Sequence, residues 1–181
     1  MGADDAVIIS DVGLEGSDVW GTASVLAAAL RKHGFDLIVC GTQSTDAITG
    51  ELPGALAERL GVPGLTYLRA LTLEGTTVRG ERETDTGYQR IRAELPALVS
   101  VTKSINEPRY PSLKGIMGAK KKPIAIESSA DVGLERSAVA KTEVLAVAAA
   151  PGREPGRVVN AANAEAGADA ILAFLQEKKL L

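Results

Sequence analysis

Residues 36–61 constrain the fold more than any other part of this sequence. They open with a short apolar run at 37–40, which predicts a strand buried on both faces of a sheet. A polar loop with a glycine at each end covers 41–50, and leucines then recur at helical spacing up to Gly61, a natural helix stop. A strand, a loop and an amphipathic helix in this order predict an open α/β sheet, in which ligands bind over the loops that follow the strands.

The loop at 41–50 has the composition of an anion-binding cradle. Its terminal glycines let the backbone approach a ligand, and the hydroxyls of Thr42, Ser44, Thr45 and Thr49 lie between them. The free N–H groups at the start of the next helix add partial positive charge. The alternative is an ordinary connection in which Thr49 or Asp46 caps that helix. The loop matches neither the P-loop nor the GxGxxG pattern.

Composition limits the classes of protein that this chain can belong to. At 181 residues it can build one core, or one domain with an appended arm. A net charge of −3 argues against a nucleic-acid partner, and a single cysteine and a single histidine leave no internal disulfide and no Cys/His metal site. The N-terminus lacks a signal-peptide pattern and no apolar run reaches the roughly 18 residues that span a bilayer. We therefore expect a cytoplasmic protein without a membrane partner.

The remaining pattern predicts an α/β fold with an open, mixed or mostly parallel sheet and flanking helices. An apolar strand at 6–10 precedes a helix that Ser17 or Asp18 caps and that ends at His33 and Gly34. From residue 65 the pattern changes to consecutive strands, with a turn at 74–76, which implies a mixed sheet. A strand at 97–102, a helix at 113–121 and a strand at 124–126 follow.

A proline- and glycine-rich stretch at 151–156 predicts a linker, followed by a helix at 164–178. The sequence therefore predicts an α/β domain over 1–150 and a linker with a C-terminal helical arm over 151–181. Two single residues receive structural interpretations. His33 stands in the last turn of its helix, where a cation favours the dipole, and Cys40 is interpreted as a small core residue.

The usual catalytic motifs are missing from the sequence. It contains no GxSxG, CxxC or HExxH pattern, and its single cysteine and single histidine do not form a pair that spacing would suggest. No pair of carboxylates stands out from a solvated surface. This favours a carrier, a binding subunit or an interaction protein, without catalytic residues of its own, over a self-sufficient enzyme.

Several blocks of sequence together resemble the beta subunit of electron-transfer flavoproteins. Six of them occur in the family's order and cover essentially the whole chain: 36–41, 46–53 with 56–60, 80–88, 95–100, 106–110 and 116–122. The resemblance implies an adenine-nucleotide-binding α/β fold that pairs with an alpha subunit in a heterodimeric electron carrier. It further implies that FAD is held mainly by the alpha subunit and that the beta subunit buries a structural AMP.

The resemblance also implies the route of the electrons. They arrive from dehydrogenases, acyl-CoA dehydrogenases of fatty acid oxidation among them, and pass to an electron-transfer flavoprotein:quinone oxidoreductase or a similar acceptor. Two alternatives stay open. In a bifurcating type a second FAD takes the place of AMP, and a stand-alone regulatory domain of the same broad fold would bind AMP or ATP without a partner subunit.

By resemblance, the AMP cradle falls on residues 41–52. Gly50, Glu51 and Leu52 stand where some members have Asn, Gln and Thr, and a Glu51 carboxylate facing a phosphate at about 4 Å would be repelled by about 1–4 kcal/mol. Glu51 is therefore expected to point away from the ligand or to weaken the site. The cofactor-binding residues expected from this match are Gly41, Thr42, Gln43, Asp46, Thr49, Gly50, Glu51 and Leu52.

The family's recognition loop, which docks partner dehydrogenases through a leucine, falls on residues 109–122. Pro108 and Pro111 stiffen this segment, and Leu113 matches the anchor, although it could instead pack internally as the first residue of its helix. The expected partner-docking residues are Arg109, Tyr110, Leu113, Ile116 and Met117.

The front of the chain departs from the family pattern. Family members have a strand, helices and further nucleotide contacts before the point where Met1 stands, so Met1-Gly2-Ala3-Asp4 resembles an internal stretch. We therefore expect an N-terminally truncated beta subunit that lacks the first strand and helices. An exposed sheet edge is predicted where that strand would pair. The 30 residues or so beyond the last core strand are expected to form an arm that embraces the alpha subunit.

Overall fold

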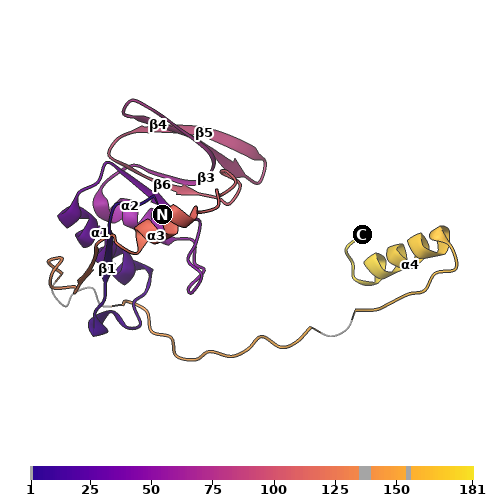
Figure 1. Ribbon diagram of the computed structural model, residues 1–181. Helices are drawn as coiled ribbons and strands as arrows, with labels where there is room; N and C mark the ends of the chain where they lie inside the picture. The colour runs from indigo at the N-terminus through magenta and orange to yellow at the C-terminus, as the bar shows by residue number, and fades with distance from the viewer. Residues whose placement is uncertain (1, 135–139, 154–155) are drawn as a thin grey trace. The chain divides into compact units, whose positions relative to one another are not determined.

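A computed structural model describes residues 2–134, 140–153 and 156–181 (Figure 1). The chain divides into two compact units, Met1–Glu143 and Val144–Leu181. The first unit contains the sheets and three of the α-helices, and the second contains the C-terminal helix. The predicted α/β fold, with a mixed sheet and flanking helices, is confirmed.

The larger sheet has five strands in the order β2-β6-β3-β4-β5. Strands β2, β6 and β3 are parallel, whereas β3, β4 and β5 form an antiparallel meander with short turns. The sequence predicted both parts, because βα alternation gives way to consecutive strands after residue 64. The bounds are β2 Leu37–Cys40, β3 Gly64–Glu74, β4 Thr77–Thr84, β5 Gly87–Glu94 and β6 Ala97–Val101.

The smaller sheet pairs β1 with β7 in parallel, with Ala6 opposite Ile124 and Ile9 opposite Glu127. A short 3-10 helix, η1, follows β1, and α1 then connects β1 to β2. The bounds are β1 Ala6–Ile9, η1 Val12–Leu14, α1 Val19–His33, α2 Leu52–Leu60, α3 Leu113–Ala119 and β7 Ile124–Glu127.

Helix α1 begins and ends where the sequence predicted. The Asp18 carboxylate accepts the Gly21 N–H at 2.8 Å, and Gly34 provides the C-cap at φ 80°. The last turn is also tied to the smaller sheet: Lys32 Nζ lies 2.9 Å and His33 Nε2 lies 3.2 Å from the Glu127 carboxylate. The Lys32 hydrogen bond is the main reason why the pKa of Glu127 lies below its usual value. His33 thus has a specific acidic neighbour in addition to its favourable place on the helix.

The core consists of two clusters on opposite faces of the larger sheet. On one face, Ala27 of α1 and Leu56 and Ala57 of α2 pack on Ile38 and Leu98. The cluster on the other face consists of Leu65, Leu68, Val78 and Val99. Strands β3 and β4 contribute the first three of these side chains, and β6 contributes Val99. Strand β6 supplies both clusters, because neighbouring residues of a strand point to opposite faces.

The prediction that residues 37–40 are buried on both faces is wrong. Ile38 is buried, but the Val39 side chain is 59% exposed. Strand β2 is an edge strand of the larger sheet and pairs only with β6 in the described part of the chain. A continuous apolar run usually indicates a central strand, so the sequence alone gave no sign of this edge position.

The second unit contains α4, Ala164–Glu177 (Figure 1). The Asn163 side chain caps this helix by accepting the Ala166 N–H at 2.9 Å. The predicted linker at 151–156 includes residues 154–155, which lie outside the described residues, and the predicted division at residue 150 stays a prediction. Among the described residues, no helix is both long and apolar enough to cross a membrane.

Replacing Leu98 with alanine tests the central role of β6. Leu98 is 0% exposed, so the substitution should lower the free energy of unfolding by about 2–5 kcal/mol through lost burial and a cavity. The matched control is Leu73→Ala in β3, where the side chain is 52% exposed and a loss below about 1 kcal/mol is expected. Urea unfolding followed by circular dichroism measures both. Equal losses would contradict the assignment of the core.

Candidate functional site

A cavity of about 490 Å³ lies between the segment that follows β1 and the loop that follows β2. The N-termini of α1 and α2 both contribute to it, as does one residue from beyond β7. This volume falls in the range of small-molecule sites. The lining residues are Ser17, Asp18, Val19, Trp20, Thr22, Ser44, Asp46, Ala47, Thr49, Glu51, Leu52 and Thr142.

Asp18 organises the α1 side of the cavity. One carboxylate oxygen accepts the Gly21 N–H, and the other accepts the Lys141 N–H at 2.8 Å and the Thr142 hydroxyl at 3.2 Å. These bonds hold the pKa of Asp18 below its usual value, with the Gly21 N–H as the largest cause. An ionised Asp18 therefore caps α1 and also holds residues 141 and 142 at the cavity.

Asp46 organises the opposite side. Its carboxylate accepts the Ala47 N–H at 2.7 Å, and the pKa of Asp46 is lowered first by the Ser44 hydroxyl and then by that N–H. The loop is also tied to the sheet at its beginning, where the Thr42 hydroxyl donates to the Val101 carbonyl at 3.1 Å. A hydrogen bond to β6 thus holds one end of the loop, and the bond from the Ala47 N–H to the Asp46 carboxylate stabilises the loop internally.

Tyr67 holds the other end of the loop. Its hydroxyl donates to the Gly50 carbonyl at 3.0 Å, and its N–H donates to the buried Ser100 hydroxyl at 2.9 Å. Tyr67 has φ 59°, at the register shift of β3, while Ile48 has φ 52° and Gly50 has φ 69°. Side chains rarely adopt positive φ, and such residues persist where the surroundings hold them, often next to functional sites.

Helix α2 begins at the cavity, and no side chain caps its first backbone donors. Its N-cap residue, Glu51, makes no side-chain capping bond, and Pro53 in the first turn has no N–H. The prediction that Thr49 or Asp46 caps this helix is therefore wrong, because the Asp46 carboxylate turns back to Ala47. The N–H groups of Leu52 and Gly54 have no acceptor within the helix, so this end of α2 is suited to a negatively charged group.

The structure brings together only part of the expected cofactor-binding set. Asp46, Thr49, Glu51 and Leu52 line the cavity, whereas Gly41, Thr42, Gln43 and Gly50 do not. Thr42 and Gly50 instead anchor the loop. The sequence treated Ser17 and Asp18 only as helix caps and did not predict that α1 and Thr142 contribute. The available signal was that the segment leading into α1 also follows a strand, at the position where α/β proteins place ligands.

The charge of the cavity limits how an anion could bind there. Three carboxylates line it, those of Asp18, Asp46 and Glu51, and none of the lining residues is a lysine or arginine. A phosphate would therefore depend on hydroxyl groups and on the α2 N–H groups. Carboxylates can in turn accept hydrogen bonds from sugar hydroxyls. No cluster of metal-ligating side chains occurs among the described residues.

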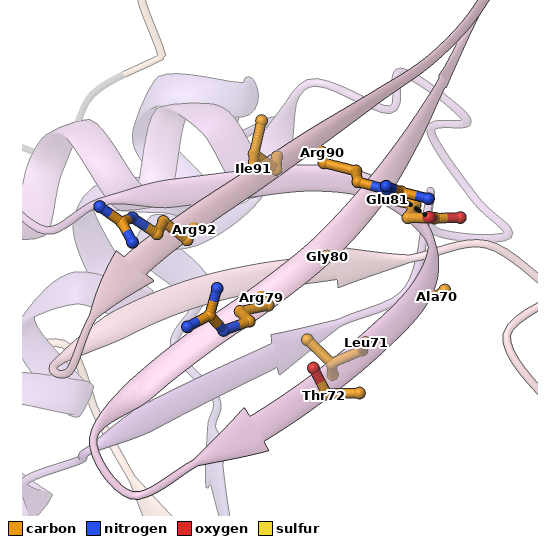
Figure 2. A pocket seen from close by; sticks show the side chains of 9 residues that line it. All are labelled: Ala70, Leu71, Thr72, Arg79, Gly80, Glu81, Arg90, Ile91 and Arg92. Carbon is orange, nitrogen blue, oxygen red and sulfur yellow. Dashed lines mark hydrogen bonds and ion pairs between the residues drawn. The ribbon is translucent and has the colours of Figure 1, made fainter.

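A second cavity, of about 430 Å³, lies over the antiparallel strands (Figure 2). Arg90 and Arg69 contact the carboxylate of Glu81 at 3.0 and 3.2 Å, and both guanidinium groups lie over the Tyr88 ring. The Arg90 bond is the main cause of the lowered pKa of Glu81. The lining also includes Arg79 and Arg92, so it carries more positive than negative charge, although Arg79 pairs with Glu74 at 3.3 Å just outside it.

An exposed apolar surface surrounds α3, and we call the side chains of Tyr110, Leu113, Ile116 and Met117 the α3 patch. Tyr110 is 96% and Leu113 is 82% exposed, so the alternative that Leu113 packs internally is wrong. Ser112 caps the helix by accepting the Gly115 N–H at 3.1 Å, which fixes Leu113 in the first turn. Contiguous exposed apolar side chains of this kind commonly mark interaction surfaces.

The fold and the cavity define an open α/β protein with a ligand-sized crevice beside two helix N-termini. The model of the electron transfer flavoprotein domain matches residues 1–132. An electron transfer flavoprotein subunit beta of Mycobacterium tuberculosis is 42% identical over 186 aligned residues, which include all of this chain and 69% of the relative.

Two further relatives support the same family. The Mycobacterium leprae subunit beta is also 42% identical over all of this chain. The caffeyl-CoA reductase-Etf complex subunit CarD of Acetobacterium woodii is 32% identical over all of this chain and 71% of its own length. The chain therefore belongs to the electron transfer flavoprotein family, as a beta subunit.

Replacing Gly50 with alanine tests the anchoring of the loop. A Cβ at this position would lie 2.8 Å from the Tyr67 hydroxyl oxygen, and the residue has φ 69°. A loss of about 1–2 kcal/mol or more in the free energy of unfolding is expected, because an alanine is strained in the left-handed region. Faster amide exchange at 42–50 should accompany it.

The matched control is Gly54→Ala in α2, where a Cβ meets no atom within 4 Å. This substitution should raise the free energy of unfolding by up to about 1 kcal/mol, because alanine favours a helix more than glycine does. If both variants were equally stable, the loop would not depend on the Gly50–Tyr67 contact.

Proposed function

We propose that this chain acts as the beta subunit of a heterodimeric electron carrier, with AMP bound in the cavity between α1 and α2. The alpha subunit would hold most of the FAD. The observation that supports this best is the cavity itself, because four of the eight residues expected to form the cradle meet the N-terminus of a second helix there. The chain would contribute binding surfaces and no catalytic residue, and it would act in the cytoplasm.

The lining residues fit the three parts of AMP. Trp20 offers an aromatic surface to the purine. The carboxylates of Asp18 and Asp46 can accept hydrogen bonds from ribose hydroxyls, and their lowered pKa values keep them ionised at neutral pH. The α2 N–H groups and the Thr49 hydroxyl can donate to the phosphate. The Glu51 carboxylate would repel the phosphate, so we expect this cavity to bind AMP with moderate affinity.

The flavin supplies the electron-carrying chemistry when it is bound in the complex. This chain would hold the alpha subunit and position the complex against its electron donors. The α3 patch has the exposure and chemistry of an anchor that includes Leu113, and Arg109, which precedes the patch in the chain, is also exposed. We propose that it docks acyl-CoA dehydrogenases and other dehydrogenases, and that electrons leave to a quinone oxidoreductase.

The second unit provides a further contact surface for the alpha subunit. Its described residues before α4 form no helix or strand, and Val144, Leu145, Val147 and Val158 are exposed. An extended segment of this kind can bury its exposed apolar side chains by lying along a partner protein. We propose that residues 151–181, together with the run before them, embrace the alpha subunit.

A specific observation supports one alternative. The Acetobacterium woodii relative is named as a subunit of a caffeyl-CoA reductase-Etf complex, which leaves open a bifurcating type whose beta subunit binds its own FAD.

The deciding experiment is to purify the chain with its alpha subunit and alone, denature each sample and identify the released nucleotide by mass. AMP supports the proposal, and FAD from the lone chain supports the bifurcating type. ATP or AMP bound without any heterodimer supports a regulatory domain, and no nucleotide refutes the site.

Replacing Glu51 with glutamine should strengthen AMP binding. The substitution removes a negative charge from the cavity and keeps the size of the side chain. Across about 4 Å of water-like dielectric, the gain is about 1 kcal/mol, or roughly fivefold in Kd. Isothermal titration with AMP on the heterodimer measures it. Glu58→Gln, on α2 but not in the cavity lining, is the control and should leave Kd unchanged; a weaker Glu51→Gln variant would argue against a phosphate at this end.

Replacing Leu113 with alanine should weaken the docking of a dehydrogenase by more than about tenfold, because truncating a central apolar anchor removes most of its buried contact. Leu73→Ala, at an exposed leucine of β3, is the control. The measurement is the rate of electron transfer from an acyl-CoA dehydrogenase at varied concentration of the heterodimer. Bound flavin and nucleotide should not change, and equal rates in the two variants would remove the α3 patch from this role.

A further inference from the structure

The single tryptophan of the chain stands in the first turn of α1 and lines the cavity between α1 and α2. Trp20 is 45% exposed, so the packing of the protein leaves much of its indole uncovered. Large aromatic side chains contribute most when their apolar area is buried and their rings are stacked. An indole that is left open at a cavity therefore offers a ligand a flat apolar surface.

Arg59 holds one face of this indole. Its guanidinium carbon lies 5.5 Å from the centre of the Trp20 ring, a distance at which the negative face of an aromatic ring attracts a cation. Trp20 is part of the cavity lining, whereas Arg59, in the last turn of α2, is not. The arginine therefore contacts the ring from outside the cavity, and the part of the ring that faces the cavity stays open.

Arg59 is in turn tied to α1. The Arg31 guanidinium, in the last turn of α1, donates a hydrogen bond to the Arg59 carbonyl. The same two helices share a buried cluster that includes Ala27 and Leu56. The guanidinium that lies over the indole thus extends from a backbone position that is fixed relative to α1, the helix that carries Trp20.

The rest of the cavity offers no second aromatic surface. Among the lining residues that the structure describes, Trp20 is the only aromatic one, and the other apolar side chains are those of Val19, Ala47 and Leu52. Every nucleotide base has a π face, and stacking on an aromatic side chain is a common way to hold it. The alternative is that Arg59 and Trp20 only cover the surface of the two helices, and this alternative predicts no dependence on the base.

We propose that Trp20 is the stacking surface for the base of the bound nucleotide, and that Arg59 is a positioning residue that holds the indole in place for it. This inference rests on the proposed function, because it requires a nucleotide in the cavity. A purine covers more of the indole than a pyrimidine does, so the site takes purine nucleoside monophosphates in preference to pyrimidine ones. Arg59 acts only through the ring and does not contact the ligand.

The first measurement needs no nucleotide. Because Trp20 is the single tryptophan, the tryptophan fluorescence anisotropy of the full chain reports on this indole alone. Arg59→Met removes the charge and should lower the anisotropy, because the ring loses the cation that orients it. Arg59→Lys keeps a cation and should restore most of the value. The control is Arg79→Met in β4, which contributes no residue to the cavity lining and should cause no change.

The second measurement is isothermal titration of the heterodimer after its bound nucleotide has been removed. Trp20→Leu should weaken AMP binding at least about tenfold, since a base loses its stacking partner. Arg59→Met should weaken it about threefold, as expected for an exposed cation–π contact, and Arg59→Lys should recover most of that loss. Ribose 5-phosphate, which lacks a base, should bind all of these variants equally, and UMP should bind the unaltered protein less tightly than AMP.

The two ligands separate this inference from the proposed function. If AMP binds but Trp20→Leu weakens AMP and ribose 5-phosphate equally, the stacking role is overturned and the nucleotide site stands. An anisotropy that Arg59→Met leaves unchanged overturns the positioning role. If AMP does not bind the unaltered heterodimer, both the inference and the proposed function are overturned. Should Trp20→Leu fail to fold, equal affinities for AMP and UMP in the unaltered protein would overturn the stacking role.

Discussion

The burial of β6 between two parallel neighbours is the constraint on which the rest of this unit depends. Ala97, Leu98, Val99 and Ser100 are all nearly inaccessible to solvent, and the strand pairs with β2 on one side and β3 on the other. Leu98 packs under the helices and Val99 packs against the antiparallel strands, so one strand holds both hydrophobic clusters together. The helices that form the candidate site are positioned through this strand.

The candidate site depends on the same strand through polar contacts. Thr42 donates to the carbonyl of Val101 at the end of β6, and the buried Ser100 hydroxyl accepts the N–H of Tyr67, whose own hydroxyl reaches Gly50. Both ends of the loop after β2 are therefore tied to β6, one directly and one through Tyr67. These hydrogen bonds to the sheet explain why a loop rich in small polar residues can hold a defined shape beside a cavity.

Much of the fold could be predicted from local pattern, because helix caps, turns and alternation depend on near neighbours in the sequence. Asp18 and Gly34 bound α1 as predicted, and the turn predicted at 74–76 joins β3 to β4. The prediction failed for Val39 and for the cap of α2. The exposure of Val39 depends on which strands become neighbours, and the cap of α2 depends on which N–H group the Asp46 carboxylate accepts. Neither outcome leaves a signal in the local sequence.

By itself, the sequence determined the order of strands and helices, the loop composition at 41–50 and the family of the chain. These follow from periodicity, capping chemistry and ordered blocks of residues, which are local properties. Only the tertiary structure decided that the N-terminus of α1 and Thr142 join the loop in one cavity, that Leu113 is exposed, that β2 lies at an edge, and that β1 and β2 belong to different sheets. These features arise from contacts between residues far apart in the chain, and their energies depend on burial and pairing that no short stretch of sequence contains.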